Sequence, residues 1–292
     1  MSRSLRIEQG PGIGLLALLA ASVAIWWSSL AGTLHLALTS DAHTHILLIL
    51  PLSLALIFFQ RTEISGKPDG RWAGALLLAL ALGARTAASW GLAISTANRL
   101  SISMAALVVW WIGSVIVCFG LETFRARMFP LCFLFLVVPF PEQILNSITV
   151  FLQHSSAWGT EVLFHLARVP VTRDGIVLSI PGLDIEVAEE CSSIRSSMML
   201  IVTTLILAHL FLRLRRNQTL LVLAAIPLSV VKNAIRIFTI AELGTRVDPA
   251  YLDGRLHRNG GVIFLALGLA VIVVLLWLMR QGEAKRLNGF AA

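Results

Sequence analysis

The stretch GVIFLALGLAVIVVLLWLM, residues 261–279, contains no charged side chain and is followed at once by Arg280. A helix needs about 20 such residues to cross the apolar core of a bilayer. Apolar runs of similar length recur along the chain, at residues 12–31, 44–59, 72–93, 102–121, 129–152, 192–212 and 220–243. The sequence therefore predicts an all-α polytopic membrane protein with about eight transmembrane helices.

The composition supports the same fold class. Hydrophobic residues make up 57% of the chain and charged residues only 13%, whereas about 25% of the residues of a soluble domain are charged. The formal net charge of +7 comes from Lys and Arg concentrated in short connections between apolar runs, as in membrane proteins generally. Membrane lipid, and not nucleic acid, is therefore the expected partner of these cations. We expect a single integral membrane domain over residues 1–292.

The run of residues 129–152 differs from the others because it contains Pro130, Pro139 and Pro141. Proline removes a backbone donor and clashes with the preceding helical turn. We therefore expect this run to be kinked or broken, with a second helix that begins at Glu142. Whether that second helix crosses the membrane stays open, because its apolar residues alternate with polar ones.

The basic connections predict the orientation of the chain. They alternate along the sequence and mark the cytoplasmic side, which puts both termini in the cytoplasm. The connection of residues 245–260 breaks the alternation, because it would be an outer loop and yet carries Arg246, Arg255 and Arg258. The basic residues assigned to the cytoplasmic side are Arg3, Arg6, Arg61, Lys67, Arg71, Arg125, Arg127, Arg213, Arg215, Arg216, Arg280, Lys285 and Arg286.

This topology brings three reactive side chains to one level of the membrane. Cys191 opens the run of residues 192–212 at the outer face. Arg236 lies about 24 Å along the outward-running helix of residues 220–243, at about 1.5 Å per residue, and so near the outer boundary. His257 is expected in the outer loop, just before the last helix descends. Cys191, Arg236 and His257 therefore form a candidate active site.

The sequence around Cys191 is EECSSIR, residues 189–195. A cysteine at a helix N-terminus faces unpaired backbone N–H groups and the positive end of the helix dipole, which favour the thiolate. Glu190 opposes ionisation while Arg195 favours it, so the sequence does not decide the state of the thiol. Glu190, Ser192 and Arg195 are supporting candidates at the site. The competing interpretation of Cys191 is a small hydrophobic core residue.

Arg236 and His257 are further candidates for a functional site. Arg236 interrupts an apolar helix together with Lys232 and Asn233, and an ionisable residue at such depth usually faces a polar interior. The alternative for Arg236 and Lys232 is that each side chain reaches the lipid headgroups. Asn233 is a candidate for orienting Arg236. His257, if it faces a cysteine, could act as general base or as the acid for the leaving group; the alternative is an inert, solvated histidine.

The segment before Cys191 predicts a small β-hairpin on the outer side. Residues 176–180, IVLSI, and residues 183–187, LDIEV, alternate with period two around Pro181-Gly182. Such a hairpin has an exposed edge that could hold an extended peptide. The alternative is a hairpin that merely connects two helices.

Metal and cofactor sites are not expected. Cys118, Cys132 and Cys191 lack CxxC spacing, which argues against a disulfide framework or a zinc site. His43 and His45 near Asp41 are a weak metal signal, because two histidines and one carboxylate do not complete a site.

Several of these motifs, in this order, resemble the exosortase/archaeosortase family. The motifs are PFP at residues 139–141, the long helix after it, the hairpin of residues 171–187, EECSSIR at 189–195, NAIR at 233–236 and His257 before the last helix. The resemblance covers about half of the chain and implies an exosortase-like catalytic core at residues 128–280. The four N-terminal helices, residues 1–127, match in hydropathy alone, and residues 281–292 would be a short cytoplasmic tail.

The resemblance implies a membrane cysteine peptidase or transpeptidase in which Cys191 is the nucleophile, Arg236 the transition-state stabiliser and His257 the proton-transfer residue. Arg195 matches the arginine that follows the family's cysteine, whereas Ser193 stands where glycine is common. The implied substrates are exported proteins that end in a short motif such as Pro-Glu-Pro, a transmembrane helix and a basic tail. They would be cleaved through a thioester at the periplasmic face of the bacterial cytoplasmic (inner) membrane, and passed to an unknown acceptor nucleophile.

Two alternatives remain at this level. A polytopic transporter or lipid-handling protein would bind an anionic substrate through Arg85, Lys232 and Arg236, but it predicts inverted repeats and central charges, and neither is evident in the sequence. A purely hydrolytic membrane cysteine protease would use the same residues and release its product to water.

Overall fold

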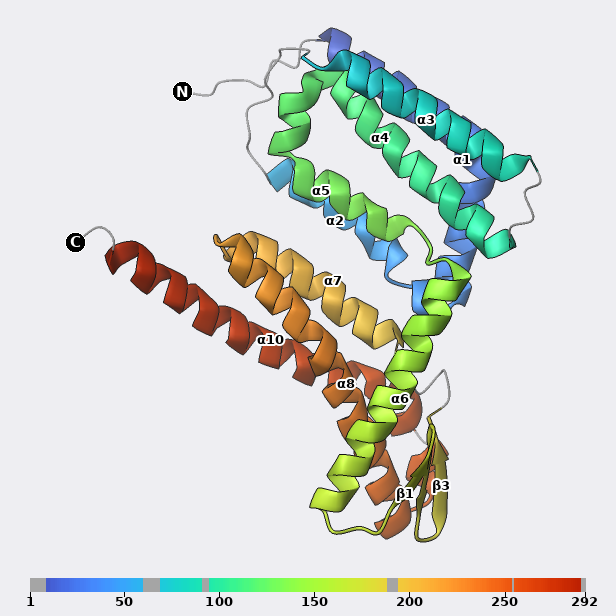
Figure 1. Ribbon diagram of the computed structural model, residues 1–292, viewed down its shortest axis with the longest axis vertical. Coiled ribbons are helices and arrows are strands. Elements are labelled where there is room, and N and C mark those ends of the chain that lie inside the picture. Colours follow the sequence, from blue (N-terminus) through green and yellow to red (C-terminus); the bar gives the residue numbers. More distant parts are fainter. Residues whose placement is uncertain (1–8, 60–68, 91–94, 188–193, 254, 290–292) are drawn as a thin grey trace. The chain divides into compact units, whose positions relative to one another are not determined.

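The computed structural model is almost entirely helical (Figure 1). Among the described residues, seven helices are long and apolar enough to cross a membrane, or eight if the two helices on either side of the break before Glu142 count as one span. The expected class, an all-α polytopic membrane protein with about eight transmembrane helices, is confirmed. The structure describes residues 9–59, 69–90, 95–187, 194–253 and 255–289.

The chain forms two compact units, Met1–Leu145 and Asn146–Ala292. The elements of the N-terminal unit are α1 (Gln9–Thr39), η1 (Asp41–His43), α2 (Ile46–Phe59), α3 (Arg71–Ser89), α4 (Thr96–Ala126), α5 (Met128–Phe133) and η2 (Leu134–Val137). The remaining elements are α6 (Glu142–Leu166), β1 (Thr172–Asp174), β2 (Val177–Ile180), β3 (Leu183–Glu186), α7 (Ile194–Phe211), α8 (Arg215–Arg246), α9 (Ala250–Asp253) and α10 (Arg255–Gly289). Helix α6 begins in the N-terminal unit and lies mostly in the C-terminal unit.

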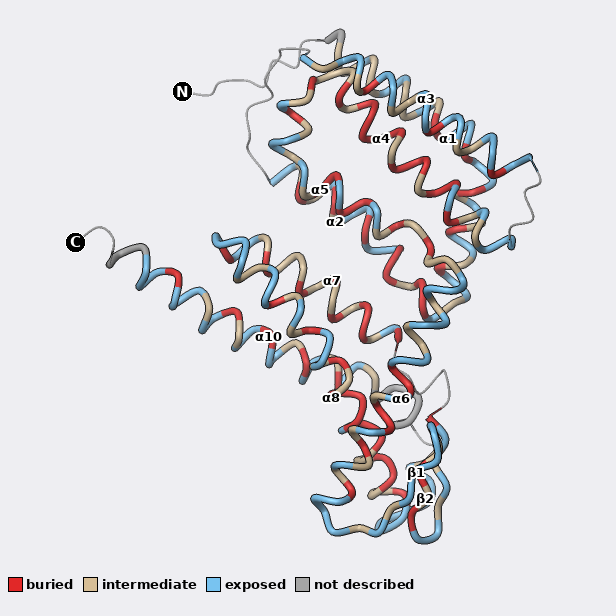
Figure 2. The backbone as a smooth tube through the Cα atoms, in the orientation of Figure 1, coloured by how far each residue is buried: buried red, intermediate tan, exposed pale blue. Residues whose placement is uncertain are grey.

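Helix α4 is the core of the N-terminal unit, and Figure 2 shows buried residues along most of its length. Two indole groups bind backbone carbonyls between α1 and α4: Trp26 Nε1 donates to the Ser103 carbonyl at 2.9 Å, and Trp110 Nε1 donates to the Leu18 carbonyl at 3.0 Å. A polar indole N–H in an apolar bundle needs a partner. These bonds therefore fix α1 against α4.

Small residues let α3 approach α4 closely. A Cβ atom added to Gly74 would lie 2.8 Å from the Gly113 carbonyl oxygen and 2.8 Å from the Val117 backbone nitrogen. Membrane helices often use such small residues to bring their backbones together.

The expected break at the Pro-Phe-Pro motif is confirmed, because helical structure stops at Val137 and resumes at Glu142. Asn98 on α4 organises the new start. Its side-chain oxygen accepts a hydrogen bond from the Glu142 backbone N–H at 3.1 Å, and its side-chain nitrogen donates to Gln143 Oε1 at 3.2 Å. One of the orphan donors at the start of α6 is therefore satisfied by a side chain from α4.

The C-terminal unit contains a helical core and a small sheet. Leu200 of α7, Leu221 and Ala225 of α8, and Ile272 of α10 are fully buried together. The sheet is antiparallel in the order β1-β2-β3, and the expected hairpin is its β2–β3 part. Gly182 has a φ of 86° in the turn after Pro181, which is the conformation that favours glycine at the third position of a type II turn. Strand β1 lies outside the alternating residues 176–187 but within the hairpin of residues 171–187 that the resemblance implied.

Two expected loops are largely helical. Helix α1 continues to Thr39, well into the stretch between the apolar runs of residues 12–31 and 44–59, and α10 starts at Arg255, although residues 245–260 were expected to be a loop. Residue 257 therefore lies in the first turn of the last helix and not before it. A charge pattern marks the ends of membrane spans and not the ends of helices, and a glycine costs only about 1 kcal/mol in a helix interior.

The C-terminal end of the last helix is held by a buried carboxylate. Residues 281–289, in the segment expected to form a tail, continue α10, and Glu283 is only 3% exposed. Its carboxylate accepts hydrogen bonds from the backbone N–H groups of Arg213 (2.9 Å) and Leu214 (3.1 Å) and from the side chain of Asn217 (2.9 Å). Glu283 thus satisfies donors at the start of α8, where the helix dipole favours a negative charge.

Candidate active site

One turn of α8 carries three buried polar side chains. Lys232 is 4% exposed, Asn233 is 1% exposed and Arg236 is 9% exposed. A lysine or arginine that reached out to lipid headgroups would expose its charged end. The burial therefore favours the interpretation that this turn of α8 faces a polar interior.

Asn233 is bound by α6. Its side-chain nitrogen donates a 2.9 Å hydrogen bond to Ser156 Oγ, and both residues are buried. One turn along α6, Thr160 donates to the Ala234 carbonyl at 3.4 Å, and a Cβ added to Gly159 would lie 3.0 Å from the Ala234 side chain. The small and hydroxylated residues of α6 thus allow the backbone of α8 to approach and fix the rotation of Asn233.

Lys232 is bound by α7. Its ammonium group donates a hydrogen bond to Ser196 Oγ, in the first turn of α7. Buried charges are costly unless they are paired or hydrogen-bonded. Lys232 therefore links α8 to α7, the helix that begins at Ile194, three residues after Cys191.

Gln153 positions the chain that leads to Cys191. Its side-chain nitrogen donates a 2.9 Å hydrogen bond to the carbonyl of Val187, which is fully buried. The Val187 N–H in turn donates to the Ile176 carbonyl at 3.0 Å. Since Gln153 and Ser156 lie three residues apart on α6, a single helical turn holds both the end of the hairpin and Asn233.

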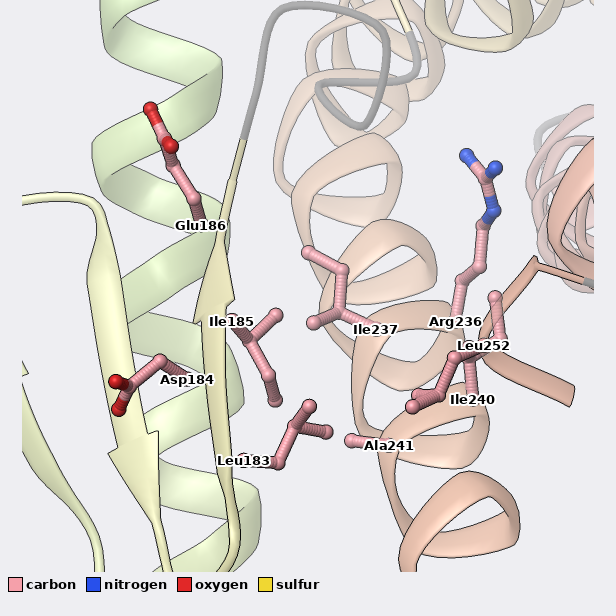
Figure 3. A pocket seen from close by; sticks show the side chains of 9 residues that line it. All are labelled: Leu183, Asp184, Ile185, Glu186, Arg236, Ile237, Ile240, Ala241 and Leu252. Atoms are coloured by element: carbon pink, nitrogen blue, oxygen red, sulfur yellow. The ribbon is translucent and has the colours of Figure 1, made fainter. Parts of the chain in front are cut away.

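A pocket of about 210 Å³ lies between β3 and α8, and we call it the β3–α8 pocket. Figure 3 shows Leu183 and Ile185 of β3 directed toward Ile237 and Ala241 of α8. The pocket's other lining residues are Asp184, Glu186, Arg236, Ile240 and Leu252. The Arg236 side chain therefore lines a cavity, and the opposite wall of that cavity is β3, the strand that precedes Cys191 in the sequence.

The structure describes only part of the candidate constellation. Glu190, Cys191 and Ser192 lie outside the described residues, and so does the side chain of His257. Arg195 is described and lies exposed in the first turn of α7. Among the supporting candidates, Asn233 lies within one helical turn of Arg236 on α8.

Sequence reasoning missed the contribution of α6. Gln153, Ser156, Gly159 and Thr160 form a polar and small stripe on one face of this helix. The spacing of these residues was a usable signal, because such a face on a membrane helix marks a contact with another helix. The spacing does not reveal which helix this face of α6 contacts.

No three His, Cys, Asp or Glu side chains in the described part of the chain are grouped so that they could hold a metal ion. His43 and His45 are instead buried around Phe140, with ring centroids 6.4 and 6.0 Å from the Phe140 ring.

The fold and these contacts define a polytopic helical membrane protein in which a small antiparallel sheet stands beside a buried polar turn of a membrane helix. The transmembrane exosortase family profile matches residues 26–278, and the chain belongs to this family. Members of the family are in general membrane cysteine transpeptidases with a role in protein sorting. Neither a curated protein nor a solved structure matches the chain.

Proposed function

We propose that this protein is a membrane cysteine transpeptidase that cleaves the C-terminal sorting signals of exported proteins. The observation that carries the proposal is the position of Arg236. Its side chain is buried on α8 and lines a pocket whose opposite wall, β3, leads directly to the cysteine motif. Family membership and the order of the motifs support the same function.

The reaction is an acyl transfer in two steps. The Cys191 thiolate attacks the scissile carbonyl carbon and forms a tetrahedral oxyanion, which the buried cation of Arg236 stabilises. The C–N bond then breaks, and His257 gives a proton to the leaving amine. The product is a thioester on Cys191, which an incoming amine or water cleaves to regenerate the thiol.

The supporting residues position these groups. Asn233 and its partner Ser156 hold the helical turn that presents Arg236. Arg195 offsets the negative charge of Glu190 beside the thiol, and Ser192 lies next to Cys191 in the chain. We assign the core to residues 128–280 of one membrane domain.

We further propose that the protein spans the bacterial cytoplasmic membrane with both termini inside and the site at the periplasmic face. The alternation of basic connections supports this orientation. A site at the outer boundary suits a substrate that is cut just outside its own transmembrane helix.

A co-expressed reporter tests the proposal. The reporter is an exported domain followed by a sorting signal from the source organism, with its motif, apolar helix and basic tail. Wild-type protein should shorten the reporter, and Cys191→Ala should leave it uncut at equal expression. Cys132→Ala is the matched control, because Cys132 is an exposed cysteine of the N-terminal unit. Normal processing by Cys191→Ala would refute the mechanism.

Mass spectrometry of the new C-terminus separates transfer from hydrolysis. An added group shows transfer to an acceptor, and a free carboxylate shows a purely hydrolytic protease. Processing that depends on Cys191 would also exclude the transporter or lipid-handling alternative as the main function.

A further inference from the structure

The outer edge of β3 presents backbone groups that suit another strand. β3 is the last strand in the order β1-β2-β3. Positions in an antiparallel ladder alternate between hydrogen-bonded and non-hydrogen-bonded pairs. The Val187 N–H bonds the Ile176 carbonyl, so by the register Asp184 and Glu186 occupy the non-hydrogen-bonded positions. Their N–H and C=O groups therefore point away from β2, and no strand of the described residues pairs with them.

The β3–α8 pocket runs along this edge. All four residues of β3, Leu183–Glu186, line the pocket. Successive side chains of a strand point to opposite faces, so a pocket on one face would be lined by alternate residues only. Since Figure 3 shows the side chains of Asp184 and Glu186 directed away from the pocket, these two residues line it with their backbone, and the pocket therefore reaches the edge of β3. Figure 3 shows the strand with α8 on the far side of the pocket.

The opposite wall is one face of α8. Arg236, Ile237, Ile240 and Ala241 have the spacing of neighbours on a helix surface, and Leu252 of α9 completes the lining. The volume of about 210 Å³ is below the roughly 300–1,000 Å³ of sites for drug-sized ligands. The pocket therefore has the size for one or two side chains of a strand and an apolar lining that suits aliphatic groups.

The charges beside the pocket disfavour acidic side chains in a bound strand. Asp184 and Glu186 are exposed, and Figure 3 shows both side chains directed away from the pocket. A strand paired with β3 would place every second side chain beside these two carboxylates, where acidic residues are repelled. Alternate side chains would instead enter the apolar pocket next to Arg236.

We propose that the outer edge of β3 binds the extended signal segment of the exported substrate as a fourth strand, with an apolar side chain of that segment in the β3–α8 pocket. This inference rests on the proposed function, because the occupant is the peptide that the transpeptidase would cleave. Backbone hydrogen bonds to Asp184 and Glu186 supply affinity, and the pocket selects the side chain. Pairing along β3 also directs the segment along the strand that leads to Cys191.

A change of specificity tests the pocket. Each residue within about one strand length, roughly five residues, of the reporter's cleavage point is changed in turn to Phe. Phe at the pocket position should block cleavage by the wild-type protein. Ile240→Ala enlarges the pocket and should raise the cleavage rate of that Phe reporter about tenfold over the wild-type protein. Ile235→Ala is the matched control, because Ile235 lies on the same helix but is exposed and outside the lining. A restored activity cannot come from misfolding.

Cross-linking tests the strand pairing independently of catalysis. Glu186→Cys in the Cys191→Ala protein is oxidised together with reporters that carry single cysteines at successive positions of the segment. Strand pairing predicts disulfides at every second position, because only alternate side chains share a face with residue 186. Equal cross-linking at all positions, or none at any position, would overturn the proposal.

The two tests separate this inference from the proposed function. If the wild-type protein cleaves the parent reporter but Ile240→Ala restores no Phe variant, the enzyme stands and the pocket assignment is wrong. If the wild-type protein does not cleave the reporter, the proposed function fails, while the cross-linking pattern still decides whether β3 binds the segment.

Discussion

The side-chain amide of Gln153 donates a 2.9 Å hydrogen bond to the backbone carbonyl of Val187. The two residues are 34 positions apart in the sequence. Val187 follows strand β3 and lies four residues before Cys191. A buried carbonyl at the end of a strand needs a donor, and α6 supplies it. The same helical turn holds Asn233 through Ser156, so α6 fixes both strand β3 and the turn of α8 that carries Arg236.

Gln153→Ala should reduce reporter cleavage about fivefold or more, because loss of a buried hydrogen bond leaves the Val187 carbonyl unsatisfied at a cost of about 1–3 kcal/mol. Cleavage rates in isolated membranes measure the effect. Gln143→Ala is the control, since Gln143 is an exposed glutamine in the first turn of the same helix. Equal rates for both variants would show that Gln153 does not position the site.

Asn233 and Ser156 should behave as a coupled pair. Asn233→Ala and Ser156→Ala should each lower the free energy of unfolding by about 1–3 kcal/mol, and the double variant should lose about 1 kcal/mol less than the sum. Unfolding in detergent, followed by tryptophan fluorescence, gives the three values. Thr219→Ala combined with Ser156→Ala should be additive, because the exposed Thr219 hydroxyl donates its hydrogen bond within its own helix, to the Arg215 carbonyl. Additivity of the Asn233 and Ser156 variants would contradict the hydrogen bond.

Glu283→Gln should lower the midpoint of thermal unfolding by several degrees. The substitution removes the negative charge from the start of α8 and replaces one accepting oxygen by a donor that faces other donors, at a cost of about 1–3 kcal/mol. At temperatures below the unfolding transition the variant should still cleave the reporter, since Glu283 lies near the C-terminal end of α10 and residue 257 lies at its start. Glu242→Gln provides the comparison: Glu242 forms an i,i+4 pair with the exposed Arg246 at 2.8 Å, which is worth only about 0.3–0.5 kcal/mol. Equal shifts would show that Glu283 does not stabilise α8.

Gly74→Ala should destabilise the N-terminal unit by about 1–3 kcal/mol, because the new methyl group would overlap the backbone of α4 and force the helices apart. Gly83→Ala on the same helix should be neutral or stabilising by up to about 1 kcal/mol, since nothing lies within 4 Å of its Cβ position. Thermal unfolding of the two variants compares them directly. If Gly74→Ala is as stable as Gly83→Ala, the close approach of α3 and α4 does not matter for stability.

Fold class could be predicted from the sequence because the physics behind it is local. An apolar run in a bilayer has no water to bind its backbone, so it must form a helix whatever its neighbours are. The break at the Pro-Phe-Pro motif and the turn at Pro181 and Gly182 follow from the backbone limits of proline and glycine at those positions. The ends of α1 and α10 were predicted wrongly, because the connections had been located from charge.

The sequence by itself determined that this is a polytopic helical membrane protein with a hairpin before Cys191, and it drew attention to Arg236 through the rarity of buried charge in a membrane helix. Only the tertiary structure decided that Asn233 binds Ser156, 77 residues away, and that β3 and α8 enclose a pocket. Such contacts depend on which helix faces align after packing. A hydrogen bond between distant residues leaves no local pattern in the sequence. A serine or an asparagine on a membrane helix looks the same in the sequence whichever helix its partner lies on.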